Sequence, residues 1–134
     1  MKVILDTHML LWALSGDERL PDKAKRIIER EDNDIYYSLV SIWEVELKHI
    51  LHPDLMTTGA RKLTEYCRES GFLRLPVSEE SIYELHTLVR SPEAKPHKDP
   101  FDRLLICQAK TEDMLFITHD PLLAGYDEPC VVTL

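Results

Sequence analysis

Short apolar runs rich in β-branched residues alternate with longer amphipathic segments along this chain, and this alternation constrains the fold strongly. The runs with strand composition cover residues 3–5, 35–40, 72–77, 114–118 and 130–133. The segments with helical spacing cover residues 9–14, 22–31, 41–51, 59–69, 78–89 and 99–112. Strands separated by helices form βαβ units, which build a parallel sheet covered by helices on both faces. The pattern therefore predicts an α/β fold: a three-layer α/β/α sandwich around a mostly parallel sheet of four to five strands.

No internal repeat, flexible linker or block of like charge divides the 134 residues, so we expect one domain over residues 1–134. No apolar run approaches the roughly 18 residues that cross a bilayer. The first apolar run is also too short for the core of a signal peptide. We therefore expect a cytoplasmic protein that does not use a membrane. The three cysteines form no C-x-x-C pair, which argues against a disulfide framework and a structural zinc site.

The chain carries 24 acidic and 16 basic side chains, which gives a formal net charge of −8. Nucleic-acid backbones attract lysine and arginine and are repelled by negative surfaces. This balance therefore argues, at first, against a nucleic-acid ligand. This argument against a nucleic-acid ligand weakens if some of the acids form a functional cluster instead of a solvated surface.

Several acids lie where helices are expected to begin, and capping explains each of them when it is taken singly. Ser41 and Glu44 fit a capping box, in which the Glu44 side chain bonds the backbone of Ser41. Asp6, Asp99 and Asp120 fit N-cap positions, and a proline follows each of the last two. These structural interpretations stand beside a functional one.

The predicted sheet places four of the acids near the same edge. Asp6 and Asp120 directly follow strands, while Glu44 and Asp102 lie in the first turns of helices. In an open parallel sheet, the segments that leave the carboxyl ends of the strands meet at one edge, where ligands bind. Four carboxylates brought together there repel one another unless a cation neutralises them. Oxygen ligands favour a hard cation, so the sequence predicts a site for Mg²⁺ or Mn²⁺.

Carboxylate-held divalent ions activate water for in-line attack on a phosphodiester. We therefore expect Asp6, Glu44, Asp102 and Asp120 to be both metal-binding and catalytic residues of a hydrolase. Two alternatives remain open. One is a phosphatase that forms an aspartyl-phosphate on Asp6, although this chain lacks the second aspartate two positions later that such enzymes use. The other is a binding module whose acidic pocket receives an arginine of a partner without catalysis.

Four stretches carry a resemblance to a known family. They read LDTH at 5–8, SIWE at 41–44, HKDPFDRLLI at 97–106 and THD at 118–120. With these stretches the chain resembles PIN-domain nucleases, specifically the VapC-type ribonuclease toxins of toxin–antitoxin pairs. The third stretch is the most specific of the four.

The resemblance implies a PIN-like fold and metal-dependent endonucleolytic cleavage of RNA, with Mg²⁺ or Mn²⁺ held by the same four acids. It also implies a cognate antitoxin protein as partner and a homodimer. Auxiliary residues beside the acids are Thr7, Asp99 and Thr118, which otherwise serve as turn or cap residues.

Basic side chains near the acids are the candidates for contacts with RNA phosphate. They are Lys48, Lys95, His97, Lys98 and Arg103. Lys48 also has the spacing of a helical ion pair with Glu44, and the others could be ordinary solvated residues. Setting aside the four acids of the site leaves a charge of about −4 for the rest of the chain. We therefore expect RNA binding to depend on a narrow basic rim.

Overall fold

The computed structural model describes residues 1–134 and contains one five-stranded sheet, in which all neighbouring strands are parallel. Its strands are β1 (Lys2–Leu5), β2 (Asp34–Ser38), β3 (Leu73–Leu75), β4 (Leu115–Thr118) and β5 (Val131–Thr133). Their order across the sheet is β3-β2-β1-β4-β5. The predicted α/β fold with a parallel sheet is confirmed, and the last strand lies at an edge.

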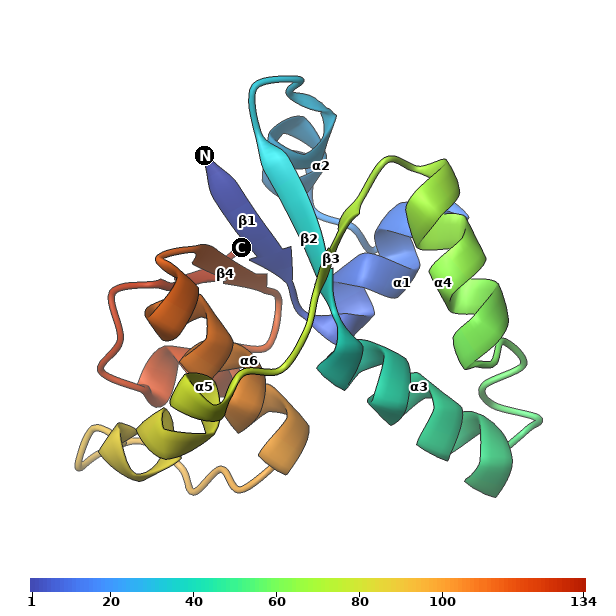
Figure 1. Ribbon diagram of the computed structural model, residues 1–134. Helices are drawn as coiled ribbons and strands as arrows, with labels where there is room; N and C mark the ends of the chain where they lie inside the picture. The colour runs from blue at the N-terminus through green and yellow to red at the C-terminus, as the bar shows by residue number, and fades with distance from the viewer.

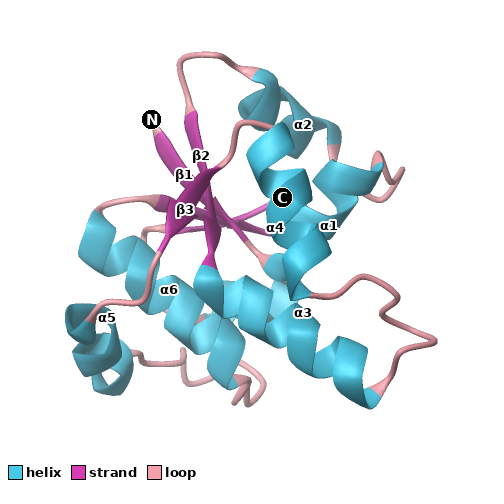
Figure 2. Cartoon of the chain, turned by 45° about the vertical axis from the view of Figure 1, so that its right-hand side comes forward, coloured by secondary structure: helices cyan, strands magenta, loops and turns pink.

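Helices cover both faces of this sheet (Figures 1 and 2). The α-helices are α1 (Thr7–Ser15), α2 (Asp22–Glu29), α3 (Leu39–Leu51), α4 (Ala60–Glu69), α5 (Glu79–Tyr83) and α6 (Pro100–Glu112). Two 3₁₀ helices, η1 (Glu84–Thr87) and η2 (Pro121–Gly125), complete the chain. Figure 1 shows α1, α2 and α4 on one side of the strands and α5 with α6 on the other. None of these helices combines the length and the apolar character needed to cross a membrane.

Alternating side chains of the strands divide the interior into two cores. Val3 and Leu5 of β1 pack in the core beneath α1, α2 and α4, whereas Ile4 packs in the core beneath α6. In β4, Phe116 and Ile117 divide between the two cores in the same way. This division follows from the two-residue period of a strand that is buried on both faces. The buried strands hold their carboxyl ends rigidly at one edge of the sheet.

The start of α3 differs from its prediction. Ser38 caps the helix, because its hydroxyl accepts a hydrogen bond from the backbone N–H of Val40 at 3.0 Å, and the same hydroxyl donates to Gln108 at 2.5 Å. The helix therefore begins at Leu39, and β2 ends earlier than expected. Ser41 lies inside α3, so the capping box predicted for Ser41 and Glu44 is wrong.

The helix expected over residues 78–89 is also shorter than predicted. Only α5 is α-helical, and the chain then tightens into η1. Side chains bond to the backbone here: the Thr87 hydroxyl donates to the carbonyl of Glu84 at 2.7 Å, and Nδ1 of His86 lies 2.6 Å from the carbonyl of Tyr83. Such local bonds compete with the helical ladder.

Candidate functional site

Asp6 lies at the carboxyl end of β1, where the chain enters α1, and is 4% exposed. Its Oδ1 accepts a hydrogen bond from the backbone N–H of Thr7 at 2.7 Å. Its Oδ2 accepts one from the hydroxyl of Thr118, at the end of β4, at 2.6 Å. The predicted cap and the predicted neighbour Thr118 therefore both hold the Asp6 carboxylate in one orientation.

Thr7 connects Asp6 to α3. Its hydroxyl donates to Oε1 of Glu44 at 2.7 Å and lies 2.9 Å from the hydroxyl of Ser41. Oε2 of Glu44 accepts a hydrogen bond from Nζ of Lys48, also at 2.7 Å. Glu44 is 3% exposed, so it is a buried carboxylate with one cationic partner. Ser41 belongs to this group of contacts, although the sequence pattern marked it only as a cap.

Asp102 on α6 and Asp120 after β4 complete the group of acids. Asp102 lies in the first turn of α6, after Asp99, whose carboxylate accepts hydrogen bonds from the N–H groups of Phe101 and Asp102. Asp120 follows β4 and caps η2 by accepting from the N–H of Leu122 at 2.9 Å. Both predicted caps are present, but only one oxygen of the Asp120 carboxylate is used in this way.

The charges of these acids act on one another. The pKa of Asp102 is raised from 3.8 to about 8, first by burial and then by repulsion from the carboxylates of Asp6, Asp99, Glu44 and Asp120. Burial also raises the pKa of Asp6, and the hydrogen bond from Thr118 opposes that shift. Asp120 and His97 lie within metal-ligand reach of Asp102, whereas Asp6 and Glu44 act on Asp102 through their charges.

This donor set fits a hard divalent cation. All four predicted ligands offer carboxylate oxygens, and the repulsion around Asp102 is the charge pattern that a bound cation relieves. Oδ2 of Asp102 and Oδ1 of Asp120 contact protein donors, while the second oxygen of each accepts no hydrogen bond from the protein. His97 lies at the same place: one nitrogen of His97 and one oxygen each of Asp102 and Asp120 lie within 4.8 Å of one another.

The predicted basic residues divide into two groups. Lys95 and Lys98 are exposed on the loop that precedes α6. His97 and Arg103 have partners inside the protein: the His97 side chain is 6% exposed, and Arg103 donates to the Tyr126 hydroxyl at 3.2 Å and to the carbonyl of Leu85. Burial, together with nearby Arg90, lowers the pKa of His97.

Tyr126 and Arg90 lie behind Asp102 and were not found by sequence reasoning. The Tyr126 hydroxyl lies 2.7 Å from Nδ1 of His97, and the Arg90 guanidinium stacks 4.6 Å from the centre of the Tyr126 ring. Gly125 allows this stacking, because a Cβ at that position would lie 2.7 Å from Cζ of Arg90. No motif marks these contacts, since His97 and Tyr126 are 29 residues apart.

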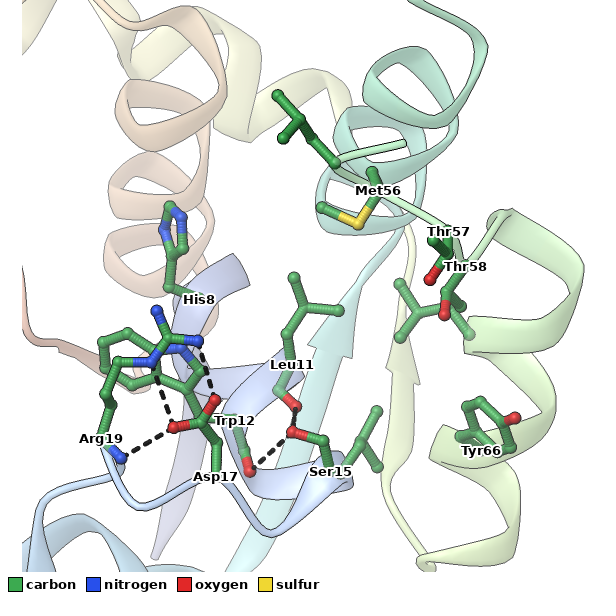
Figure 3. Close-up of a pocket in the computed structure, with 13 residues that line it drawn as sticks. His8, Leu11, Trp12, Ser15, Asp17, Arg19, Met56, Thr57, Thr58 and Tyr66 are labelled. Carbon is green, nitrogen blue, oxygen red and sulfur yellow. Dashed lines mark hydrogen bonds and ion pairs between the residues drawn. The ribbon is translucent and has the colours of Figure 1, made fainter. Parts of the chain in front are cut away.

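A separate cavity of about 690 Å³ is bounded by α1, by the loop that follows α3, and by α4. Figure 3 shows His8 and Trp12 at one wall, with Met56 and Tyr66 at the other. An ion pair between Asp17 and Arg19 closes one end. None of the four predicted acids lines this cavity, so it is distinct from the carboxylate cluster.

Comparison with known proteins places this geometry in a family. A model of the PIN domain family matches residues 3–129, which is nearly the whole chain. No curated protein matches the sequence significantly.

Solved structures share the fold. VapBC2 from Rickettsia felis, crystallised with a DNA fragment from its promoter, superposes with a TM-score of 0.68 at 14% identity, over 100% of this chain and 98% of that one. A toxin–antitoxin complex from Klebsiella pneumoniae gives 0.62 at 20% identity, over 98% and 96%. FitAcB from Neisseria gonorrhoeae gives 0.51 at 17% identity, over 88% and 87%. At these identities the likeness is one of fold.

Proposed function

Because this chain belongs to the PIN domain family, we propose that it is a metal-dependent endoribonuclease and the toxin of a toxin–antitoxin pair. The observation that carries the proposal is the set of acids around Asp102, which come from separate segments: burial first, and then the charges of the neighbouring acids, raise the pKa of Asp102 to about 8. Capping alone explains neither the convergence nor the burial of Asp6 and Glu44. Each cap needs one acid at one helix start.

Asp6, Glu44, Asp102 and Asp120 would hold Mg²⁺ or Mn²⁺ in this enzyme. When bound, a divalent ion makes water a better nucleophile and offsets the negative charge that develops on the phosphodiester. Thr118 fixes Asp6, and Thr7 fixes Glu44 through its hydroxyl. These contacts hold the carboxylates before substrate arrives, which reduces the reorganisation needed for the reaction.

Lys48 has a second proposed role besides its ion pair. Its side chain is 42% exposed while Nζ lies 2.7 Å from Glu44, so it places a positive charge at the rim of the acidic site. Exposed Lys95 and Lys98 lie on the loop that precedes α6. We assign contacts with RNA phosphate to these three lysines first. His97 and Arg103 are weaker candidates for such contacts, because their side chains already have partners in the protein.

A cleavage assay tests the function. Single-stranded and structured RNAs, with the matching DNAs as controls, are incubated with the purified protein and Mg²⁺ or Mn²⁺. We expect RNA cleavage that a chelator abolishes and that falls about 100-fold or more in Asp6→Asn and Asp102→Asn, because each variant loses a ligand of the cation that offsets transition-state charge. Asp127→Asn, an exposed acid outside the site, is the matched control and should cleave normally.

Cleavage that survives chelation, or that persists in both site variants, would reject the proposal. Preferential cleavage of DNA would reject RNA as the substrate while keeping a nuclease. An inactive protein that binds a partner tightly, and loses that binding as Glu44→Gln, would favour the acid-pocket binding module instead.

The proposed partners are an antitoxin, the RNA substrate and a second copy of the chain, with residues 1–134 forming one PIN-like domain. An acidic pocket can receive an arginine of an inhibitor, because guanidinium groups bind carboxylates through paired hydrogen bonds. Co-purification with the product of a neighbouring short reading frame tests the antitoxin. Loss of that complex in Glu44→Gln would support an arginine-mediated contact.

A further inference from the structure

A chain of polar side chains lies buried behind Asp102. Nε2 of His97 lies 3.1 Å from Oδ2 of Asp102, and Nδ1 of His97 lies 2.7 Å from the hydroxyl of Tyr126. The same hydroxyl accepts a hydrogen bond from Nη1 of Arg103 at 3.2 Å. Tyr126 is 4% exposed and the His97 side chain 6%, so water competes little for these contacts. The contacts therefore set the orientation of both side chains.

The available donors and acceptors decide the direction of the hydrogen bonds among these side chains. Arg103 can only donate, so the Tyr126 oxygen accepts from it. The single proton of Tyr126 has two available acceptors: Nδ1 of His97 at 2.7 Å and the backbone carbonyl of His97 at 3.3 Å. The shorter contact is the better hydrogen bond. Nδ1 then accepts, and a neutral His97 carries its proton on Nε2, from which it donates to Asp102 when that carboxylate is ionised, as a bound cation favours.

This tautomer decides what His97 does at the site. Its position near Asp102 and Asp120 would suit a metal ligand. A ring nitrogen that carries a proton, however, has no lone pair with which to bind a metal ion. His97 therefore acts on Asp102 as a donor to Oδ2, and Oδ1 stays free of protein hydrogen bonds.

Arg90 anchors Tyr126, which is the side chain of this group furthest from Asp102. It stacks on the Tyr126 ring and donates to the backbone carbonyls of Lys95 and Leu122. These bonds tie the loop that carries His97 to the segment that carries Tyr126. The tyrosine hydroxyl is thus presented to His97 by parts of the chain that are anchored independently of Asp102.

We infer that His97 and Tyr126 are positioning residues, which orient Asp102 for the metal ion through the path Tyr126–His97–Asp102, and that His97 is not itself a metal ligand. This inference rests on the proposed metal-dependent function. Residues that orient a metal ligand through a hydrogen bond change metal affinity about 10- to 100-fold when they are removed.

Replacements of His97 by two different amides test the inference. Glutamine can place an N–H near the position of Nε2, where it reaches Asp102, whereas the shorter asparagine places it near Nδ1. We expect Mg²⁺ and Mn²⁺ affinities, measured by titration calorimetry, to stay close to wild type in His97→Gln. They should fall about 10-fold or more in His97→Asn and in Tyr126→Phe. Exposed His52→Ala and Tyr66→Phe are the matched controls.

Nitrogen NMR of the His97 ring gives a readout that does not depend on metal or activity. In the wild type above about pH 8, where Asp102 is ionised, Nε2 should carry the proton and Nδ1 should not, and Tyr126→Phe should disturb this preference. Thermal unfolding of each metal-free variant identifies any replacement that fails to fold. If one of the two amide variants is lost in this way, Tyr126→Phe and the tautomer of the wild type carry the test.

Three results would overturn the inference: a proton on Nδ1 in the wild type, unchanged metal affinity in His97→Asn and Tyr126→Phe, or a loss in His97→Gln as large as in His97→Asn. The last result would make His97 a ligand. Failure of the wild type to bind either ion would reject the metal-dependent function and this inference together. Metal binding with the expected pattern but no RNA cleavage would reject only the ribonuclease.

Discussion

Asp102 makes the stability of the metal-free protein depend on pH. Its pKa is raised from 3.8 to about 8 in the folded state, so between these values the folded protein holds a proton that the unfolded chain has lost. Stability contributed by this group therefore falls as pH rises through that window. Bound Mg²⁺ favours the ionised carboxylate. We expect added Mg²⁺ to raise the melting temperature more at about pH 8 than at about pH 5.

Scanning calorimetry with and without Mg²⁺ checks this prediction, and Asp102→Asn is the informative comparison. An asparagine cannot titrate, so the variant should lose both this part of the pH dependence and much of the response to Mg²⁺. If Asp102→Asn retained the wild-type response at both pH values, the coupling between Asp102 and the ion would be wrong.

The hydroxyl of Thr7, and not the size of its side chain, supports the Glu44 carboxylate. It is 2% exposed and donates to Glu44, so Thr7→Val keeps the shape but leaves Oε1 of a buried carboxylate without this donor. We expect Thr7→Val to lower the free energy of unfolding by about 1–3 kcal/mol and to weaken Mg²⁺ binding. Urea unfolding and calorimetric titration measure the two effects. Thr7→Ser keeps the hydroxyl and should lose much less; equal losses in both variants would refute this role.

At the start of α6, one acid stabilises the helix. Asp99 caps the helix through two backbone N–H groups, and Pro100 follows at the first helical position. Asp99→Ala should therefore lower the unfolding free energy by about 1 kcal/mol, whereas Asp99→Ser retains a capping hydroxyl and should lose little. Urea unfolding of both variants checks this expectation.

Cleavage assays of the same two variants separate capping from chemistry. If Asp99 acts only as a cap, Asp99→Ser should cleave RNA as well as the wild type. A serine variant with normal stability and reduced cleavage would instead assign Asp99 an auxiliary role in the site, as its repulsion of Asp102 allows.

An exposed apolar surface on α3 is the candidate interface of the proposed homodimer. Trp43, Leu47 and Ile50 form an apolar row along α3, with exposures of 58%, 37% and 67%. Burying such a row is favourable by about 25 cal/mol per Å². We expect Ile50→Glu to shift the protein from dimer to monomer in light scattering coupled to size exclusion. Ile82→Glu, on α5, is the control and should leave the dimer intact. A monomeric wild type at high concentration would reject the homodimer.

Local chemistry made much of the fold and part of the site predictable. Short β-branched runs between amphipathic segments, such as residues 3–5, favour strands covered on both faces. The Asp-Pro pairs at Asp99 and Asp120 start helices because proline suits the first helical position. The convergence of carboxylates followed from where those segments must meet. The exact start of α3 did not, because Ser38 and Ser41 are equally good caps and the choice depends on Gln108, a contact 70 residues away.

Tertiary contacts decided what the side chains around the acids do. The amino-acid order determined which carboxylates stand after strands and at helix starts, since those positions depend on neighbours in the chain. It could not show that His97 and Arg103 face Tyr126, or that Ser41 joins Thr7 beside Glu44. These contacts join segments far apart in the chain, and hydrogen bonds of that kind exist only after the sheet and its two layers of helices have brought their partners together.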